Sequence, residues 1–242
     1  MLKLNHLTGF GSGAAGGDNT SYAFDGTGTR YLTDGTYLSV PSSSDWAVGT
    51  GQFTFELWVY VTQAVDNQVM MHNLTDATVS TNWNFMLGAS QVPTFNSGVA
   101  AIKGGSTSVS LNTWTHILVS RDGSNDVRMF IDGVEEGAAA NSANDFSSDD
   151  FMQIARVAWS GGASFKGYLD EIRISDIARH TTAFTPETTQ CTSDANTLLL
   201  IHGGETKSGT TGSGATFTES GNTGHTVTEV GNAEATGNFY KF

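Results

Sequence analysis

A run of ten residues, FTFELWVYVT, constrains the fold more than any other part of the chain. Its odd-numbered positions, Phe53 to Val61, are all apolar, whereas its even-numbered positions are Thr, Glu, Trp, Tyr and Thr. A period of two puts alternate side chains on opposite faces of a strand, and a helix cannot satisfy it. The run therefore predicts a central strand of a sandwich. Its second face, with Trp58 and Tyr60 beside Glu56, is expected to be partly covered or to line a groove.

Further strand patterns follow one another at close spacing, separated by Asp-Gly turns. The best hairpin is DVRMFIDGVEEGA, whose strands meet at Asp132-Gly133, a pair suited to a type I′ turn with positive φ. The 29 glycines and the absence of a long amphipathic helical pattern predict an all-β antiparallel sandwich of the jelly-roll type. The 242 residues suit one domain, and 38% apolar residues are enough to build its core.

The chain is acidic, with 24 acidic against 11 basic residues and a net charge of −13. Such a chain repels phosphate backbones, so we expect no nucleic-acid binding. The charge either keeps a Gly-rich β protein soluble or attracts a cation. No apolar run approaches a membrane span, and the start, MLKLNHLTGFGSG, has no signal-peptide pattern, so we expect synthesis in a cytoplasm. The single cysteine, Cys191, cannot form an intrachain disulfide.

Two adjacent carboxylates, Asp170 and Glu171, interrupt the strand pattern FKGYLDEIRIS. In a regular strand Leu169 would share a face with Glu171, whereas Ile172 would share the other face with Asp170. The apolar face changes parity there, which predicts a β-bulge or bend at Asp170-Glu171. Gly167 is expected to allow close approach of another backbone.

These carboxylates do not predict a catalytic pair, because neighbours in a strand point to opposite faces. We expect Asp170 to fix a bend or a cation, and Glu171 to pair with a base such as Arg173 or to face solvent. The six histidines lack metal-ligand spacing, and His116 is interpreted as a packed, hydrogen-bonded residue. No G-x-S-x-G, P-loop or dinucleotide fingerprint is present. The sequence therefore predicts a protein that is not an enzyme.

Four motifs occur in a characteristic order: FDGTGTRYLTDGTYLSVPSSSDWAVGTGQFTFELWVYV, NTWTHILVSRDG, MFIDGVEEG and FKGYLDEIRIS. In this order they resemble the laminin-G-like jelly rolls of the concanavalin A-like lectin/glucanase superfold, over roughly residues 21–186. Glucanases of this superfold carry a strand with Glu-x-Asp-x-(x)-Glu. This chain has no such run, and Glu56 stands alone on its strand. The resemblance thus implies a non-catalytic member.

A narrower resemblance covers DEIRISDIARHTTAFTPE and NTLLLIHGG. They look like laminin-G-like modules of tailed bacteriophages, especially marine ones, in which an AR…FTP segment runs into the opening strands of a next module. LLLIHGG and ATFTESGNTGHTVTEVGNAEA match such an opening, yet they lie at the end of this chain. We expect this segment to complete a sandwich, either its own, as in a circular permutation, or that of a neighbouring subunit. A disordered Gly/Thr-rich tail is the alternative.

The expected organisation has three parts. Residues 1–20 form an N-terminal arm, residues 21–202 form the laminin-G-like jelly roll, and residues 203–242 supply the Gly/Thr-rich C-terminal strands.

Sugar sites combine aromatic platforms with planar amides and carboxylates. We expect such a site on loops at Trp83, which lies between Asn82 and Asn84, and at Trp159 in VAWSGGAS. The alternative is that these tryptophans fill the core or a subunit interface.

The resemblance also implies a calcium site. Many laminin-G-like modules bind Ca²⁺ through the Asp of FDG and the Asp of LDE, which here are Asp25 and Asp170. Calcium takes several oxygen ligands, so carboxylates from distant strands can share one ion. The alternative is that Asp25 is a turn residue and that Asp170 caps a bend through its own hydrogen bonds.

Together these features predict a non-catalytic virion structural protein of a tailed phage, a capsid decoration or a fibre or tail component on the virion surface. Its jelly roll is expected to bind glycans or other surfaces. Expected partners are other virion proteins, further copies in a homo-oligomer and host-surface glycans, without nucleic acid or membrane insertion. The alternatives are a purely structural cementing protein, and a glycoside hydrolase with two carboxyl groups about 5–10 Å apart in a cleft.

Overall fold

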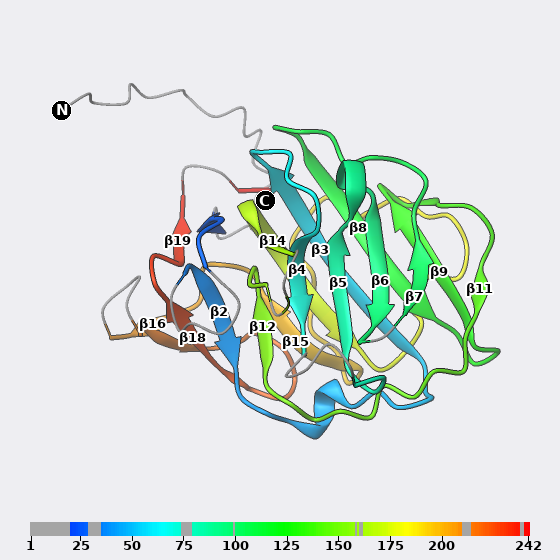
Figure 1. The fold of residues 1–242 in the computed structure, drawn as a ribbon. Helices are drawn as coiled ribbons and strands as arrows, with labels where there is room; N and C mark the ends of the chain where they lie inside the picture. The colour runs from blue at the N-terminus through cyan, green and yellow to red at the C-terminus, as the bar shows by residue number, and fades with distance from the viewer. Residues whose placement is uncertain are drawn as a thin grey trace.

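Two antiparallel β-sheets pack face to face in the protein, seen in a computed structural model (Figure 1). The structure describes residues 20–28, 35–73, 79–98, 100–157, 159, 162–209, 214–237 and 240–242. The predicted N-terminal arm, 1–20, lies outside these residues except for Thr20. The fold is an all-β sandwich, as the strand patterns predict.

The first sheet, sheet A, has the strand order β10-β9-β8-β3-β14-β1-β19, with β15 beside β14 and β11 beside β9. Its strands are β1 Ser21–Asp25, β3 Phe53–Val61, β8 Trp114–Arg121, β9 Asp126–Ile131, β10 Val134–Glu135, β11 Ala140–Asn141, β14 Lys166–Ser175, β15 Thr197–Ile201 and β19 Glu234–Thr236. The strands β8, β3 and β14 lie next to one another in this sheet, so side chains from three distant parts of the chain meet on its faces.

The second sheet, sheet B, has the order β16-β17-β18-β2-β12-β4-β5-β6-β7, with β13 parallel to β4. Its strands are β2 Tyr37–Val40, β4 Gln68–His72, β5 Trp83–Leu87, β6 Pro93–Ser97, β7 Ala101–Gly104, β12 Met152–Ile154, β13 Ala163–Ser164, β16 Lys207–Ser208, β17 Thr216–Thr218 and β18 Thr226–Val230. Short 3-10 turns, Ser44–Trp46 and Ala89–Gln91, precede β3 and β6. Figure 1 shows β2, β12, β4, β5 and β6 in front of β14, β3 and β8.

The core lies between the sheets and is rich in aromatic rings. Phe53 and Phe55 of β3 are fully buried there, in contact with Phe95 of sheet B at ring-centroid distances of 5.3 and 5.5 Å. The alternation of β3 is therefore confirmed, because its odd-numbered residues face the core and its even-numbered residues face the outside of sheet A.

The irregularity predicted for β14 is present. The pairing of β14 with β3 shifts register between Asp170 and Arg173, and Glu171 has a positive φ of 50°. The shift keeps Leu169 and Ile172 both in the core, as a β-bulge does. Gly167, at φ 148°, lies so close to Tyr60 that a Cβ would overlap the carbonyl of Tyr60.

The hairpin between β9 and β10 has the predicted geometry, with φ 47° at Asp132 and 77° at Gly133. Its tip also contacts another part of the chain. The amide of Phe184 donates a 2.9 Å hydrogen bond to the carbonyl of Gly133, and a Cβ at this glycine would overlap the Phe184 carbonyl. Position 133 therefore requires glycine for two reasons: the turn has a positive φ there, and Phe184 leaves no space for a side chain.

The C-terminal strands join the sandwich of their own chain. In sheet B, β18 pairs with β2, and in sheet A, β19 pairs with β1, which lies between β19 and β14 (Figure 1). The described parts of residues 21–202 and 203–242 thus form one sandwich. The alternative of a disordered tail is wrong for β16 to β19, and the pairing within one chain corresponds to the permuted arrangement.

Candidate functional site

The structure corrects the predicted position of Trp83, which lies on β5 and not on a loop. Its side chain is 0% exposed and contacts Phe55 at a centroid distance of 4.4 Å. Its indole Nε1 donates to the carbonyl of Trp46 at 3.3 Å. The aromatic ring fills the core, because a large apolar side chain on the inner face of a sheet is removed from water there. It cannot act as a platform for a ligand.

The two flanking asparagines also form hydrogen bonds within the protein. Asn82 is 0% exposed, and its Nδ2 donates to the carbonyl of Asn73 at 2.6 Å. The Oδ1 of Asn84 accepts from Asn96 at 2.8 Å. Trp159 is half-buried and lies against Gly162, and its neighbours in the loop are outside the described residues. The role of Trp159 in ligand binding stays a prediction.

The predicted calcium pair is not brought together. Asp25 pairs with Lys166 across β1 and β14, four residues from Asp170. At about 3.3 Å per residue the Cα atoms of Lys166 and Asp170 are about 13 Å apart. Asp25 lies on the neighbouring strand, so it is at least as far from Asp170, too far for one ion with ligands at about 2.4 Å. Asp25 accepts from the amide and hydroxyl of Thr27, while Asp170 accepts from the amides of Glu171 and Lys241. These two carboxylates therefore do not fit a shared calcium site.

Three aromatic rings lie side by side on the outer face of sheet A. Tyr60 of β3 is directly opposite Trp114 of β8 and Tyr168 of β14. The ring centroids are 5.6 Å apart for Tyr60 and Trp114 and 5.8 Å apart for Tyr60 and Tyr168, both in edge-to-face contact. All three residues are half-buried, so the row is partly accessible from outside the sandwich. We call these residues the aromatic row.

The next residues along the same face are covered. Trp58, which lies opposite His116 and Asp170, is only 7% exposed. Phe242 contacts its ring edge-on at 5.9 Å, and the Nζ of Lys241 lies 4.0 Å from the ring centroid. The segment 240–242 thus separates the aromatic row from the part of this face around Glu56.

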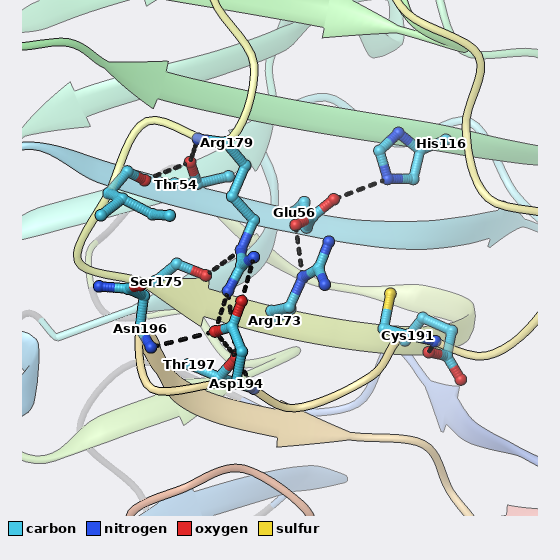
Figure 2. A network of polar contacts seen from close by, with 12 residues as sticks. Thr54, Glu56, His116, Arg173, Ser175, Arg179, Cys191, Asp194, Asn196 and Thr197 are labelled. Carbon is cyan, nitrogen blue, oxygen red and sulfur yellow. Dashed lines mark hydrogen bonds and ion pairs between the residues drawn. The ribbon is translucent and has the colours of Figure 1, made fainter.

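Beyond Trp58, a cavity of about 240 Å³ opens over the bulge of β14, and we call it the polar pocket. Its floor carries Glu56, which accepts from the Nε of Arg173 at 2.6 Å and contacts the Nε2 of His116 at 3.2 Å (Figure 2). Glu56 is 3% exposed. The polar pocket is lined by Glu56, Trp58, His116, Arg173, His180, Phe184, Thr185, Glu187 and Cys191.

The roof of the polar pocket comes from the connection between β14 and β15, residues 176–196, which we call the covering segment. Arg179 attaches it to the sheet: its guanidinium donates to both carboxylate oxygens of Asp194, at 3.0 and 2.8 Å, and to the hydroxyl of Ser175 at 2.6 Å (Figure 2). The backbone amide of Arg179 donates to Thr54 at 2.9 Å. A bidentate pair with several further bonds restricts the geometry of this segment.

The charge state of Glu56 follows from its partners. Burial alone would raise its pKa, but the hydrogen bond from His116 and the positive charge of Arg173 outweigh burial and lower the pKa to about 2. The opposite applies to Cys191, because burial raises the pKa of its thiol well above the usual range. Glu56 is therefore an anion and Cys191 a protonated thiol at neutral pH.

Glu171 pairs with a base, as predicted, but the base is His202 and not Arg173, and the alternative of a carboxylate that faces solvent is wrong. Its side chain is buried and accepts from the backbone amide of Cys191 at 2.6 Å, and it contacts the Nδ1 of His202 at 2.8 Å. Arg173 pairs with Glu56 instead. The bulge turns Glu171 toward β15, which explains why the predicted pairing with Arg173 is wrong.

Metal-binding clusters and membrane-spanning helices are both absent from the described part of the chain. Within these residues, no group of three or more His, Cys, Asp or Glu side chains is placed to bind a metal ion. No helix among them has the length and apolar character needed to cross a membrane.

Comparison with protein families identifies the fold family. A model described as the concanavalin A-like lectin/glucanases superfamily, of laminin G type, matches residues 32–183, more than half of the chain. The chain belongs to this superfamily. Its members include lectins and glucanases, so membership alone does not show whether this chain is a binding module or an enzyme. A search of the curated proteins finds no significant match.

Several solved structures are similar to this chain. A candidate carbohydrate binding protein from Bacteroides ovatus superposes with a TM-score of 0.63 at 13% identity, over 90% of this chain and 59% of its own. A heptameric SAP-like pentraxin from Limulus polyphemus has a TM-score of 0.49 at 14% identity, over 69% and 81%. Domain 4 of the arabinanase AbnA from Geobacillus stearothermophilus, in complex with arabinotriose, has 0.49 at 18%, over 66% and 82%. The likeness to the Bacteroides protein shows the fold alone, and this lectin/glucanase module spans about three fifths of that protein.

Proposed function

We propose that this superfamily member is a non-catalytic glycan-binding module and that its aromatic row, Trp114, Tyr60 and Tyr168, is the ligand platform. The observation that carries the proposal is the register of three adjacent strands, which places one half-buried aromatic ring on each strand in an outward-facing line. Sugar rings present apolar C–H faces, and tyrosine and tryptophan combine an apolar ring with a polar tip.

The geometry of the row restricts the kind of glycan. The two centroid spacings, 5.6 and 5.8 Å, give a platform that spans more than one sugar unit. Neighbouring rings are inclined to one another by 62° and 74°, so the surface is corrugated and not flat. A corrugated row fits a single twisted glycan chain better than the flat surface of a crystalline polysaccharide.

The charge of the chain restricts the ligand further. A net charge of −13 repels anionic polymers, which disfavours glycans that carry sulfate or many uronates. We therefore expect a neutral glycan. Support from relatives is limited to the fold, although the Bacteroides ovatus protein is described as a candidate carbohydrate binding protein.

The absence of catalysis is also part of the proposal. Glycosidases of the two-carboxylate type need one carboxyl group protonated near neutral pH, which requires a raised pKa. Glu56 has the opposite property, since His116 and Arg173 lower its pKa to about 2. Glu187 also lines the polar pocket, so hydrolysis remains the competing function. A Glu56→Gln variant that stays folded but loses a measured glycosidase activity would support hydrolysis over binding.

For the biological setting, we propose a virion protein of a tailed phage, in which this module decorates the capsid or belongs to a fibre or tail. The proposal rests on the order of the motifs around DEIRISDIARHTTAFTPE, which resembles phage modules. Mass spectrometry of purified particles, with antibody labelling of the intact virion, would test it. A chain found only in the lysate of infected cells, and never in particles, would contradict it.

A glycan array tests the binding function directly. The wild-type protein is expected to bind at least one neutral oligosaccharide, and Trp114→Ala is expected to lose about 2 kcal/mol of binding, about 30-fold in Kd, as for a buried aromatic contact. Phe151→Ala is the matched control, because Phe151 is an exposed aromatic residue next to β12 of the other sheet. Binding that is equal in both variants would refute the platform, and a protein that binds no glycan would favour the purely structural cementing role.

A further inference from the structure

The polar pocket contains polar atoms that the protein leaves without hydrogen bonds. The Nδ1 of His116 is buried and has no partner among the described residues. Arg173 donates to Glu56 through its Nε. Its Nη1 and Nη2 form no further bond within this part of the chain and are not among its fully buried atoms, so a molecule in the pocket can reach them. Buried donors and acceptors are almost always satisfied by protein, water or ligand. The pocket is therefore suited to exchange hydrogen bonds with a molecule from outside the fold.

The charges that face the pocket indicate an uncharged guest. The charge of Arg173 is compensated by Glu56 at 2.6 Å, and Glu187 on the covering segment adds a second negative charge. His180 lines the same space, and burial lowers its pKa, so it adds no positive charge at neutral pH. The pocket thus has no excess positive charge for a carboxylate or phosphate. It offers donors on Arg173 and acceptors on Glu56 together, which suits hydroxyl groups, since each is both donor and acceptor.

The walls of the polar pocket add an apolar surface, and the pocket has the volume of a single small ring. Trp58 and Phe184 line the cavity, and the ring of His180 stacks on Phe184 at 3.6 Å. A volume of about 240 Å³ is smaller than the roughly 300–1,000 Å³ of pockets for drug-sized ligands, so it holds one small ring and not a chain. The sheet closes one side and the covering segment the other, so a sugar unit with neighbours on both ends would not fit.

We propose that the polar pocket is a second ligand site, distinct from the aromatic row, which takes a single neutral monosaccharide unit at the end of a glycan. The donors of Arg173 and the acceptors of Glu56 bind its hydroxyl groups, and Trp58 and Phe184 contact its apolar face. The inference rests on the proposed function for the class of ligand only. Its geometry is independent of the row, because Phe242 lies against Trp58 between the two sites.

Nuclear magnetic resonance of the histidine side chains tests this site. The probes are D-glucose, D-galactose, D-mannose, L-arabinose and N-acetyl-D-glucosamine as neutral sugars, and D-glucuronate as the anionic one. At least one neutral sugar is expected to shift the imidazole signals of both His116 and His180 in a saturable manner, while glucuronate at equal concentration leaves them unchanged. If no neutral sugar shifts both signals, or if glucuronate shifts them more strongly, the proposal is overturned.

Two variants assign the shifts to the cavity. Thr185 is exposed and lines the pocket, so Thr185→Trp fills the cavity from the covering segment without altering the buried ion pair. Thr181→Trp places the same side chain on the same segment away from the cavity lining. The sugar-induced shifts are expected to vanish in Thr185→Trp and to persist in Thr181→Trp. Shifts that persist in both variants would overturn the pocket as their origin.

A third variant separates this inference from the proposed function. Tyr60→Ala removes the central ring of the aromatic row and leaves the lining of the polar pocket intact. Monosaccharide shifts at His116 are expected to persist in this variant. Loss of oligosaccharide binding by the row together with intact pocket shifts would support both sites. Intact pocket shifts in a protein whose row binds no oligosaccharide would refute the proposed function alone.

Discussion

Replacement of Glu56 by glutamine is the sharpest test of the polar centre on sheet A. The carboxylate of Glu56 is 3% exposed and contacts Arg173 and His116, at 2.6 and 3.2 Å. Glutamine keeps the shape of the side chain and one acceptor but removes the charge. Arg173 is then left as a buried cation without its counter-ion, which is the costly situation for a broken buried ion pair.

The magnitude follows from the proton affinity of Glu56. Its pKa falls from an ordinary 4.5 to about 2 in the folded protein, which corresponds to about 3 kcal/mol at about 1.4 kcal/mol for each tenfold change. Measurements on other proteins give about 3–5 kcal/mol when one partner of a buried pair is removed. We therefore expect Glu56→Gln to lower the free energy of unfolding by about 3 kcal/mol at pH 7.

The pH dependence provides an independent check. A pKa lowered by folding stabilises the protein fully above the unfolded value of 4.5, and this stabilisation is lost as the pH falls through 4.5 toward about 2. At pH 3 the difference between wild type and Glu56→Gln is expected to shrink to less than half of its value at pH 7.

Urea unfolding followed by tryptophan fluorescence, at pH 7 and pH 3, measures both quantities. Glu187→Gln is the control, since this carboxylate lines the same pocket but is exposed, and its loss should change the stability by less than about 0.5 kcal/mol. A Glu56→Gln protein within about 1 kcal/mol of wild type at pH 7, or a difference that does not change at pH 3, would refute the reasoning.

Three further predictions concern the scaffold around the site. Gly167→Ala should lower the free energy of unfolding by at least about 2 kcal/mol, because φ is 148° and a Cβ would overlap Tyr60. Urea unfolding measures this, and an unchanged stability would contradict the close approach of Gly167 to Tyr60. Arg179→Gln should lower the free energy of unfolding by about 1–3 kcal/mol and speed proteolysis within residues 176–196, because the bonds to Asp194 and Ser175 are lost. An unchanged cleavage rate would show that other contacts hold the covering segment in place. Cys191 should resist iodoacetamide at pH 8 in the folded protein and react once urea unfolds the protein, since burial raises the pKa of its thiol. Equal alkylation rates in the folded and unfolded states would contradict the raised pKa.

Much of the fold could be predicted because the patterns that specify it are local. The alternation of β3, the turn at Asp132-Gly133 and the parity change at Asp170-Glu171 each depend on a few neighbouring residues, and each is confirmed. Side-chain period and turn chemistry act over the same short range. The pairing of the C-terminal strands with β2 and β1 depends on long-range contacts, so the sequence left both a cis and a trans arrangement open.

The site could be predicted only in part, because it depends on the register between distant strands. The mixed outer face of β3 did indicate a face that is partly covered or lines a groove, and Trp58 on this face is covered by Lys241 and Phe242. Nothing in the sequence, however, states that Trp114 and Tyr168 lie opposite Tyr60, since register is set by pairing in three dimensions. Trp83 misled the prediction for a related reason. Its asparagine neighbours are typical of a surface loop, yet both are buried: the amide of Asn82 donates to the carbonyl of Asn73, and the amide oxygen of Asn84 accepts from Asn96.

Isothermal titration of Tyr60→Ala with the best neutral oligosaccharide from the array tests the central claim most directly. Tyr60 is the middle ring of the aromatic row and contacts both of its neighbours, at 5.6 and 5.8 Å, so its removal interrupts the platform. We expect Tyr60→Ala to weaken binding about 30-fold, while Phe151→Ala binds as wild type. An affinity of Tyr60→Ala equal to that of wild type, in a protein that still unfolds cooperatively, would contradict the assignment of the glycan site to this face of the sandwich.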